Sequence, residues 1–108
     1  MNLEKSTEII ELVVYTVKPE MNDIYVNTAI ESFRKLVMSF EGFISYELFQ
    51  CSRNRNVFMD HVRWESLEFA EDAAKQVKAL QKAPEYKEYL DSFESLEIFN
   101  HFHQVKAW

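Results

Sequence analysis

Runs of apolar residues mark four segments of this chain as β-strands. The first, residues 8–17, is rich in β-branched residues. By alternation, one face of this strand carries Ile10, Leu12, Val14 and Thr16, and the other carries Ile9, Glu11, Val13, Tyr15 and Val17. Because both sets are largely apolar, the strand is expected to be covered on both sides. Residues 43–51, 57–64 and 96–105 are the other predicted strands.

Two further segments repeat apolar residues at three- and four-residue steps, which is the spacing of an amphipathic helix. Asn22 or Asp23 can cap the first helix, and its apolar stripe is Val26, Ile30, Phe33, Val37 and Phe40. Gly42, the only glycine in the chain, supplies the left-handed conformation that ends such a helix. The second helix is predicted to begin at Ser66.

The order strand–helix–strand–strand–helix–strand predicts an α+β, ferredoxin-like βαββαβ fold. Such a fold has a four-stranded antiparallel sheet with both helices on one face. Residues 8–105 form the predicted single domain, between a disordered tail of residues 1–7 and a C-terminal tail of residues 106–108. We expect the open face of the sheet to carry Ile9, Val13, Tyr15, Phe58, Val62 and Phe99. A face this apolar predicts a homodimer with its sheets face to face.

Composition and charge narrow the range of partners. The chain of 108 residues is 47% hydrophobic and 15% aromatic, which is ample for a core and for a ligand cavity or a subunit interface. Its net charge of −6 disfavours binding to nucleic acid. Cys51 is the single cysteine, so no internal disulfide forms. No apolar stretch is long enough to span a membrane, and we expect a cytoplasmic protein without membrane partners.

Three short motifs in this order resemble the antibiotic biosynthesis monooxygenase family of dimeric α/β barrels. They are Val17-Lys18-Pro19 at the end of the first strand, Glu41-Gly42-Phe43 with the strand after it, and Trp64-Glu65-Ser66-Leu67 between the third strand and the second helix. The resemblance spans roughly residues 8–105. Members include oxygenases that need no cofactor and act on phenolic polycycles, quinol oxygenases and haem-degrading enzymes.

The chain departs from the haem-degrading members at the positions that matter for iron. Those relatives place an asparagine on the first strand, where this chain has Glu11. They also place an iron-ligating histidine ten residues after the tryptophan, and Ala74 stands there. The resemblance therefore implies an activity other than haem degradation, and no cofactor is expected.

Glu11, His101 and Asp60 are the candidate catalytic residues. Glu11 interrupts an apolar face, where a charge is costly unless it is paired or hydrated. With a raised pKa it could deprotonate a phenol, or it could be a structural ion pair. Asp60 would share its cavity, or would instead form a salt bridge with His101 or an arginine.

His101 and His103 share one strand face. One of them could act as an acid or base, or the pair could bind zinc or iron together with a carboxylate, although a metal site is the lesser reading. The expected substrate-binding residues are Tyr15, Trp64, Phe99 and His103. Most other aromatic residues are expected to be core.

Three functions remain open on sequence grounds. The first is a dimeric oxygenase that binds a small planar phenolic or quinol compound, in which Glu11 or a histidine removes a proton and the anion reacts with dioxygen. The second is a non-catalytic binding or stress-related protein on the same scaffold. The third is a metal-dependent enzyme that uses His101 and His103.

Overall fold

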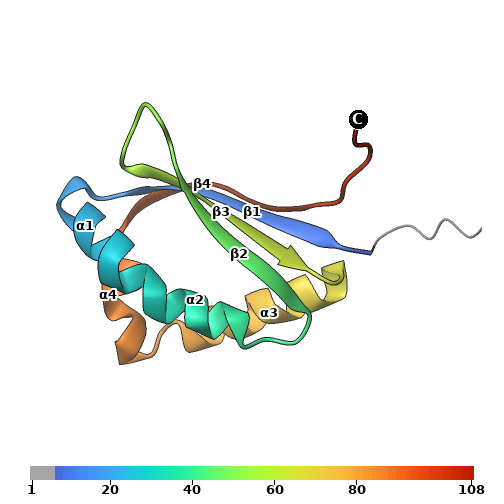
Figure 1. The fold of residues 1–108 in the computed structure, drawn as a ribbon. Helices are drawn as coiled ribbons and strands as arrows, with labels where there is room; N and C mark the ends of the chain where they lie inside the picture. Colours follow the sequence, from blue (N-terminus) through green and yellow to red (C-terminus); the bar gives the residue numbers. More distant parts are fainter. Residues whose placement is uncertain (1–6) are drawn as a thin grey trace, which may run out of the picture.

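The protein forms one antiparallel sheet with helices packed on one side of it. The computed structural model describes residues 7–108. Figure 1 shows the helices as a layer beneath the sheet. The strands are β1 (Ile9–Val17), β2 (Phe43–Gln50), β3 (Val57–Trp64) and β4 (Phe93–Phe102). The helices are α1 (Asn22–Ile24), α2 (Ile30–Met38), α3 (Leu67–Leu80) and α4 (Lys87–Asp91), with short turns at Pro19–Met21 and Pro84–Tyr86 and a π-helical segment at Tyr25–Ala29.

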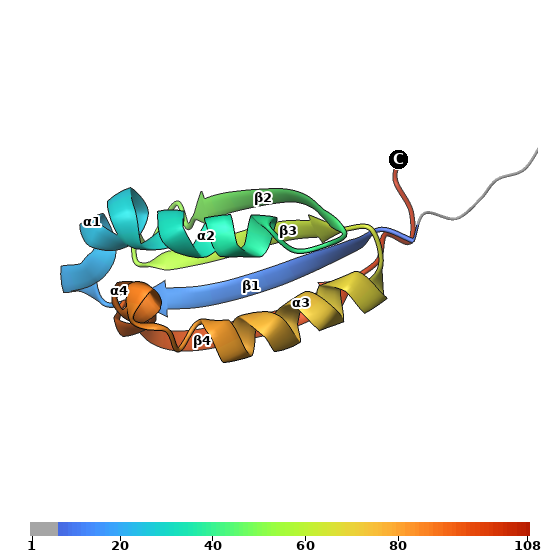
Figure 2. The ribbon, with the colours of Figure 1, turned by 90° about the horizontal axis from the view of Figure 1, so that it is seen from below.

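The strand order is β2-β3-β1-β4, and each neighbouring pair is antiparallel. Figure 2 shows α2 and α3 side by side across this sheet. The predicted ferredoxin-like fold is therefore confirmed. β4 begins at Phe93, three residues before the predicted Leu96. The reason is that Phe93 pairs with Val17 of β1 and adds its ring to the core.

Ser66 behaves as the sequence predicts, but Gly42 does not end the first helix, because α2 ends at Met38 with Ser39 as its C-cap and Gly42 lies in the turn before β2. Gly42 has a φ of +84° and follows α2, and its carbonyl accepts a hydrogen bond from the backbone of Glu65 at 2.8 Å. Ser66 caps α3 by accepting a hydrogen bond from the backbone N–H of Phe69 at 3.3 Å. These contacts connect the end of one helix to the start of the other.

The first helix differs from the prediction at its start. Tyr25–Ala29 is π-helical, and the N–H of Ile30 bonds to the carbonyl of Tyr25 five residues earlier. The wider turn changes which side chains face the sheet. As a result Tyr25 is fully buried, whereas the predicted Val26 is 40% exposed.

The prediction of which sheet face is open was wrong. Ile9, Tyr15, Phe58 and Val62 are buried among helical residues, and Phe99 lies opposite Val13 on that same face. Both faces of β1 are apolar, so alternation alone could not show which one the helices cover. The aromatic rings of Tyr25 and Tyr89 pack on the odd-numbered side and decide it.

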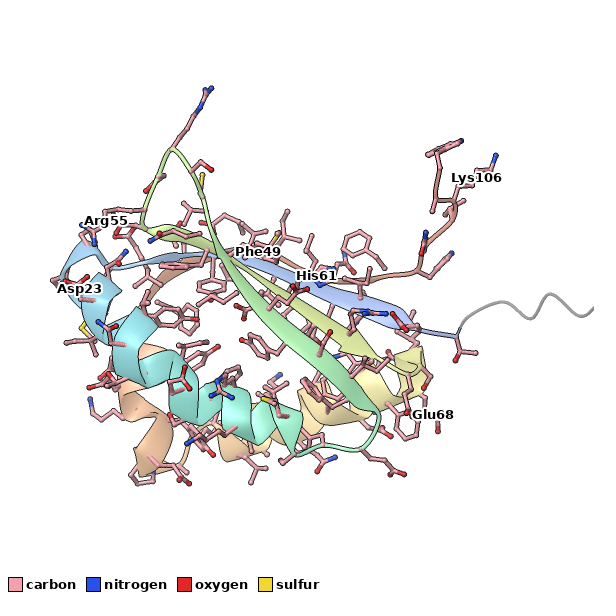
Figure 3. The ribbon with its side chains drawn as sticks, viewed as in Figure 1. Asp23, Phe49, Arg55, His61, Glu68 and Lys106 are labelled. Carbon is pink, nitrogen blue, oxygen red and sulfur yellow. The ribbon has the colours of Figure 1, made fainter. Side chains whose placement is uncertain are left out.

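The open face instead carries the even-numbered residues of β1 and their partners. Ile98 pairs with Val14, and Ile98 and Phe102 are 44% and 46% exposed. On β2 and β3, the rings of Phe49 and His61 meet edge to face at 6.4 Å, as Figure 3 indicates. His61 lies 3.5 Å from the carboxylate of Glu47. Besides these apolar residues, the face carries Arg63, which pairs with Ile10, and Glu97, whose carboxylate accepts a hydrogen bond from Thr16 at 3.0 Å.

The two ends of the chain add little to the domain. The predicted N-terminal tail lies outside the described residues except for Thr7, whose hydroxyl donates to the carbonyl of Glu65 at 2.7 Å. Residues 103–108 follow β4 without regular structure, and Figure 3 shows Lys106 in this segment away from the sheet. No helix among the described residues is long and apolar enough to cross a membrane.

Gly42→Ala is expected to destabilise the fold by roughly 2–4 kcal/mol, from left-handed strain and a steric clash. A Cβ there would lie 2.4 Å from Cγ of Phe69. Urea unfolding measures the loss. In a Phe69→Gly background, which removes both the ring and the Cβ that would lie 2.5 Å away, these contacts disappear, so the same substitution should cost clearly less. Equal costs in both backgrounds would contradict the clash.

Candidate functional site

A cavity of about 640 Å³ lies between the sheet and the helices. From the strands, it is lined by Glu11, Val13, Tyr46, Asp60, Val62, Trp64, Phe93, Leu96 and Phe99. From the helices and adjoining turns, it is lined by Phe33, Val37, Ala73, Ala74, Val77, Lys78, Gln81, Tyr89 and Leu90. The wall is mostly apolar, and it contains two carboxyl groups, Glu11 and Asp60.

Asp60 accepts hydrogen bonds from two phenols. Tyr15 donates to its Oδ1 at 2.8 Å, and Tyr46 donates to its Oδ2 at 2.7 Å. The residue is 4% exposed. Burial raises the pKa of Asp60 to about 6, although the two phenol hydrogen bonds oppose this rise and the charge of Glu11 adds to it. This carboxyl group can therefore gain and lose a proton near neutral pH.

The phenol groups around Asp60 are held by ring packing. Tyr25 bonds to Tyr15 through their hydroxyl groups, and its ring stacks on that of Tyr89 at 6.0 Å. Burial raises the pKa values of Tyr15, Tyr25, Tyr46 and Tyr89 above the usual range of a phenol. The four hydroxyl groups stay neutral, and those of Tyr15, Tyr25 and Tyr46 form hydrogen bonds to the carboxylate or to one another.

Glu11 forms the second polar group of the cavity. Nε2–H of His101 donates to its Oε1 at 2.9 Å, because the two residues are cross-strand partners on β1 and β4. Burial raises the pKa of Glu11, and the hydrogen bond and charge of His101 oppose that rise. His101 does not line the cavity, so it acts on the cavity through Glu11.

The structure brings most of the predicted site residues together. Glu11, Asp60, Trp64 and Phe99 line the cavity, and His101 contacts Glu11. Tyr15 is fully buried and lies behind the wall, where it reaches Asp60. His103 follows the end of β4 and is exposed.

Asp60 shares the cavity with Glu11, as one of the two interpretations expected. Its hydrogen-bond partners are tyrosines instead of the His101 or arginine of the other interpretation. Among residues 7–108 there is no group of three histidine, cysteine or acidic side chains that could hold a metal ion.

Trp64 contributes a large apolar surface to the wall. It is 1% exposed, and the edge of its ring meets Phe43 at 5.8 Å. Its Nε1–H has no hydrogen-bond partner within the part of the chain that the structure describes. A buried donor of this kind is costly.

Sequence reasoning missed Tyr25, Tyr46 and Tyr89 as parts of the site. Tyr46 and Asp60 lie on neighbouring strands with the same facing, since Tyr46 pairs with Val62 and Leu48 with Asp60. That pairing could have been inferred from the predicted hairpin. Tyr25 and Tyr89 carry no such signal, because helices bring them to the sheet from distant parts of the sequence.

The haem-binding positions of the resembling family are not suited to iron here. Ala74, the residue ten positions after Trp64, lines the cavity with Ala73, and a methyl group cannot ligate a metal.

The fold resembles several solved structures. The chain superposes on a candidate antibiotic biosynthesis monooxygenase from Bordetella bronchiseptica with a TM-score of 0.76 and 19% identity, over 93% of this chain and 99% of that one. The cofactor-independent oxygenase SnoaB from Streptomyces nogalater gives 0.70 and 14% identity, over 94% and 96%. A conserved protein from Methanosarcina mazei gives 0.68 and 18% identity, over 93% and 95%. At these identities the likeness establishes the fold.

Sequence comparison identifies the family. No curated protein sequence matches the chain significantly. The sequence model of one family, antibiotic biosynthesis monooxygenase, matches residues 8–92. Because this match covers β1 to α4, which is most of the domain, the chain belongs to the antibiotic biosynthesis monooxygenase family.

Proposed function

We propose that this protein is an oxygenase that acts, without a bound cofactor, on a small planar phenolic or quinol compound. The observation that carries the proposal is the pair of buried carboxyl groups, Glu11 and Asp60, in an otherwise apolar cavity. The cavity volume of about 640 Å³ lies within the range of roughly 300–1,000 Å³ that is typical of small-molecule sites. A flat aromatic ligand would lie against Trp64 and Phe99.

Asp60 is the base in this proposal. Its pKa of about 6 leaves it largely ionised at neutral pH yet basic enough to accept a proton. Among residues 7–108, the hydrogen bonds that Asp60 accepts come from the neutral phenols of Tyr15 and Tyr46. Glu11 is a weaker candidate, because His101 already donates to one of its oxygens and a charged imidazole would reduce its basicity.

The oxidation follows from the charge that deprotonation creates. The phenolate places electron density on a ring carbon, and this carbon forms a bond to dioxygen. When the O–O bond breaks, the carbon becomes a carbonyl and the second oxygen leaves as water. In sum, a CH₂ group of the keto tautomer and O₂ give C=O and H₂O. All the electrons that reduce dioxygen come from the substrate.

The proposed oligomeric state is a homodimer, in which the open faces of the two sheets pack against each other. Ile98 and Phe102 on β4 and Phe49 on β2 are each more than 40% exposed. An apolar face of this extent is stabilised by a two-fold partner that presents the same face. A cytoplasmic location also remains part of the proposal.

Asp60→Asn is expected to lower oxygen uptake by about 100-fold or more, because it removes the base. The assay is an oxygen electrode with a panel of two- and three-ring phenols and hydroquinones. Asp72→Asn is the matched control, because Asp72 is an exposed aspartate on α3 outside the cavity. An unchanged rate in Asp60→Asn would exclude Asp60 as the base. Ligand binding without oxygen uptake in the unmodified protein would favour a binding function.

The pH dependence of the reaction gives a second test. The base must be ionised, so the rate with a neutral phenol should rise as the pH increases through about 6, the pKa of Asp60. Asp60→Asn should abolish this rise in any residual activity. If the rise persists unchanged in that variant and is lost in Glu11→Gln, the base is Glu11.

Ile98→Lys is expected to convert a dimer into a monomer, because it places a charge on the apolar surface of the proposed interface. Native mass spectrometry at neutral pH measures the change. Leu80→Lys is the matched control: Leu80 is 46% exposed and lies on α3, while Ile98 is 44% exposed. A monomer in the unmodified protein, or a dimer that survives Ile98→Lys, would contradict the proposed interface.

A further inference from the structure

Tyr25 occupies an unusual place relative to the cavity. It is fully buried, and it does not line the cavity, whereas Asp60 and Tyr46 do. Its ring packs edge to face on Tyr15 at 5.7 Å and lies 5.4 Å from Phe58. Tyr25 therefore stands behind the wall and cannot touch a bound ligand.

The direction of the hydrogen bonds from Tyr25 to Tyr15 and from Tyr15 to Asp60 follows because each hydroxyl group has one proton to donate. The hydroxyl of Tyr15 has one proton, which it donates to Oδ1 of Asp60 at 2.8 Å. The hydroxyl of Tyr25 also bonds to that of Tyr15. With Asp60 ionised, Tyr25 must be the donor in this second bond. The chain thus runs from Tyr25 through Tyr15 to the carboxylate.

The backbone that holds Tyr25 is the π-helical segment. Such segments are rare, and they recur at functional sites. Here the wide turn directs Tyr25 toward the sheet, while its neighbour Val26 is 40% exposed. The irregular turn is thus the feature of the first helix that delivers a hydroxyl group to the chain.

We infer that Tyr25 is a positioning residue that acts on Asp60 through Tyr15. By donating to Tyr15, it polarises that hydroxyl and fixes it as a donor to the carboxylate. Hydrogen bonds in such a chain strengthen one another, most of all when the chain ends on a charge. Tyr25 therefore favours the ionised form of Asp60. Any effect of Tyr25 on the reaction rests on the proposed function, in which the ionised Asp60 is the base.

Other groups also act on Asp60 and bear on any test. They are Glu11 and Tyr15 on β1, Tyr46 on β2 and Tyr89 on α4, with Lys78 of α3 on the same cavity and His101 of β4 behind Glu11. Tyr46 bonds to the other carboxylate oxygen, at 2.7 Å. A test must therefore distinguish the effect of Tyr25 on Asp60 from the effects of changes in these other groups.

Tyr25→Phe removes one hydroxyl group and keeps the ring. We expect the pKa of Asp60 to rise by about 0.5, which is a roughly threefold tighter hold on its proton. The measurement is a pH titration of the ¹³C resonance of the Asp60 carboxyl group by NMR with no ligand present. Because this readout needs no substrate, failure of the oxygen-uptake assay would leave it unaffected, and an unchanged pKa would leave the proposed function standing.

A double-mutant cycle tests the route of the effect. In a Tyr15→Phe background, Tyr25→Phe should cause no further change in the pKa of Asp60, because the connecting hydroxyl is gone. Ile30→Ala is the control for a loosened core, since Ile30 is buried on the same helix and does not line the cavity. The inference is overturned by an unchanged pKa in Tyr25→Phe, by an equal rise in both backgrounds, or by an equal rise in Ile30→Ala.

Discussion

The rest of this structure depends on the burial of the Asp60 carboxylate. An isolated charge in an apolar interior is costly unless donors surround it. Here Tyr15 and Tyr46 donate directly, and Tyr25 supports Tyr15 from behind. These three tyrosines come from β1, β2 and the π-helical segment. A single polar group thus ties the two layers of the fold together at the wall of the cavity.

Phenol groups as donors limit the cost of burying the Asp60 carboxylate. Phenol hydroxyls are neutral, so they satisfy the carboxylate without neutralising it, unlike an arginine or a lysine. The pKa of Asp60 consequently remains near neutrality. Glu11, on the neighbouring strand β1, is stabilised in a different way, because its hydrogen-bond donor is His101. Two carboxyl groups in one cavity are thereby held in two different electrostatic environments, which is a common basis for separate roles in proton transfer.

The two faces of the sheet have separate tasks. The helical face encloses the cavity, whereas the opposite face leaves Ile98, Phe102 and Phe49 exposed to the surroundings. β1 lies at the centre of both, which explains why its sequence is apolar on each side. A charge is tolerated on this strand only where a partner strand supplies a donor, as β4 does for Glu11.

The sequence by itself determined the order of the elements, the positive φ of Gly42, the cap at Ser66 and the membership of the family. These features depend on local chemistry: periodicity, a positive φ and a side-chain oxygen beside free amides. It also indicated that Glu11 or Tyr15 could lie near His101 and His103, because in a ferredoxin-like fold the last strand neighbours the first.

Only the tertiary structure decided which face of β1 the helices cover and which residues surround Asp60. Alternation is symmetric when both faces of a strand are apolar, so the packing of distant rings such as Tyr25 and Tyr89 makes the choice. The π-helical turn that orients Tyr25 has no strong local signature in the chain. Contacts between residues far apart in sequence are set by packing, and for that reason the partners of Asp60 could be found only in the folded protein.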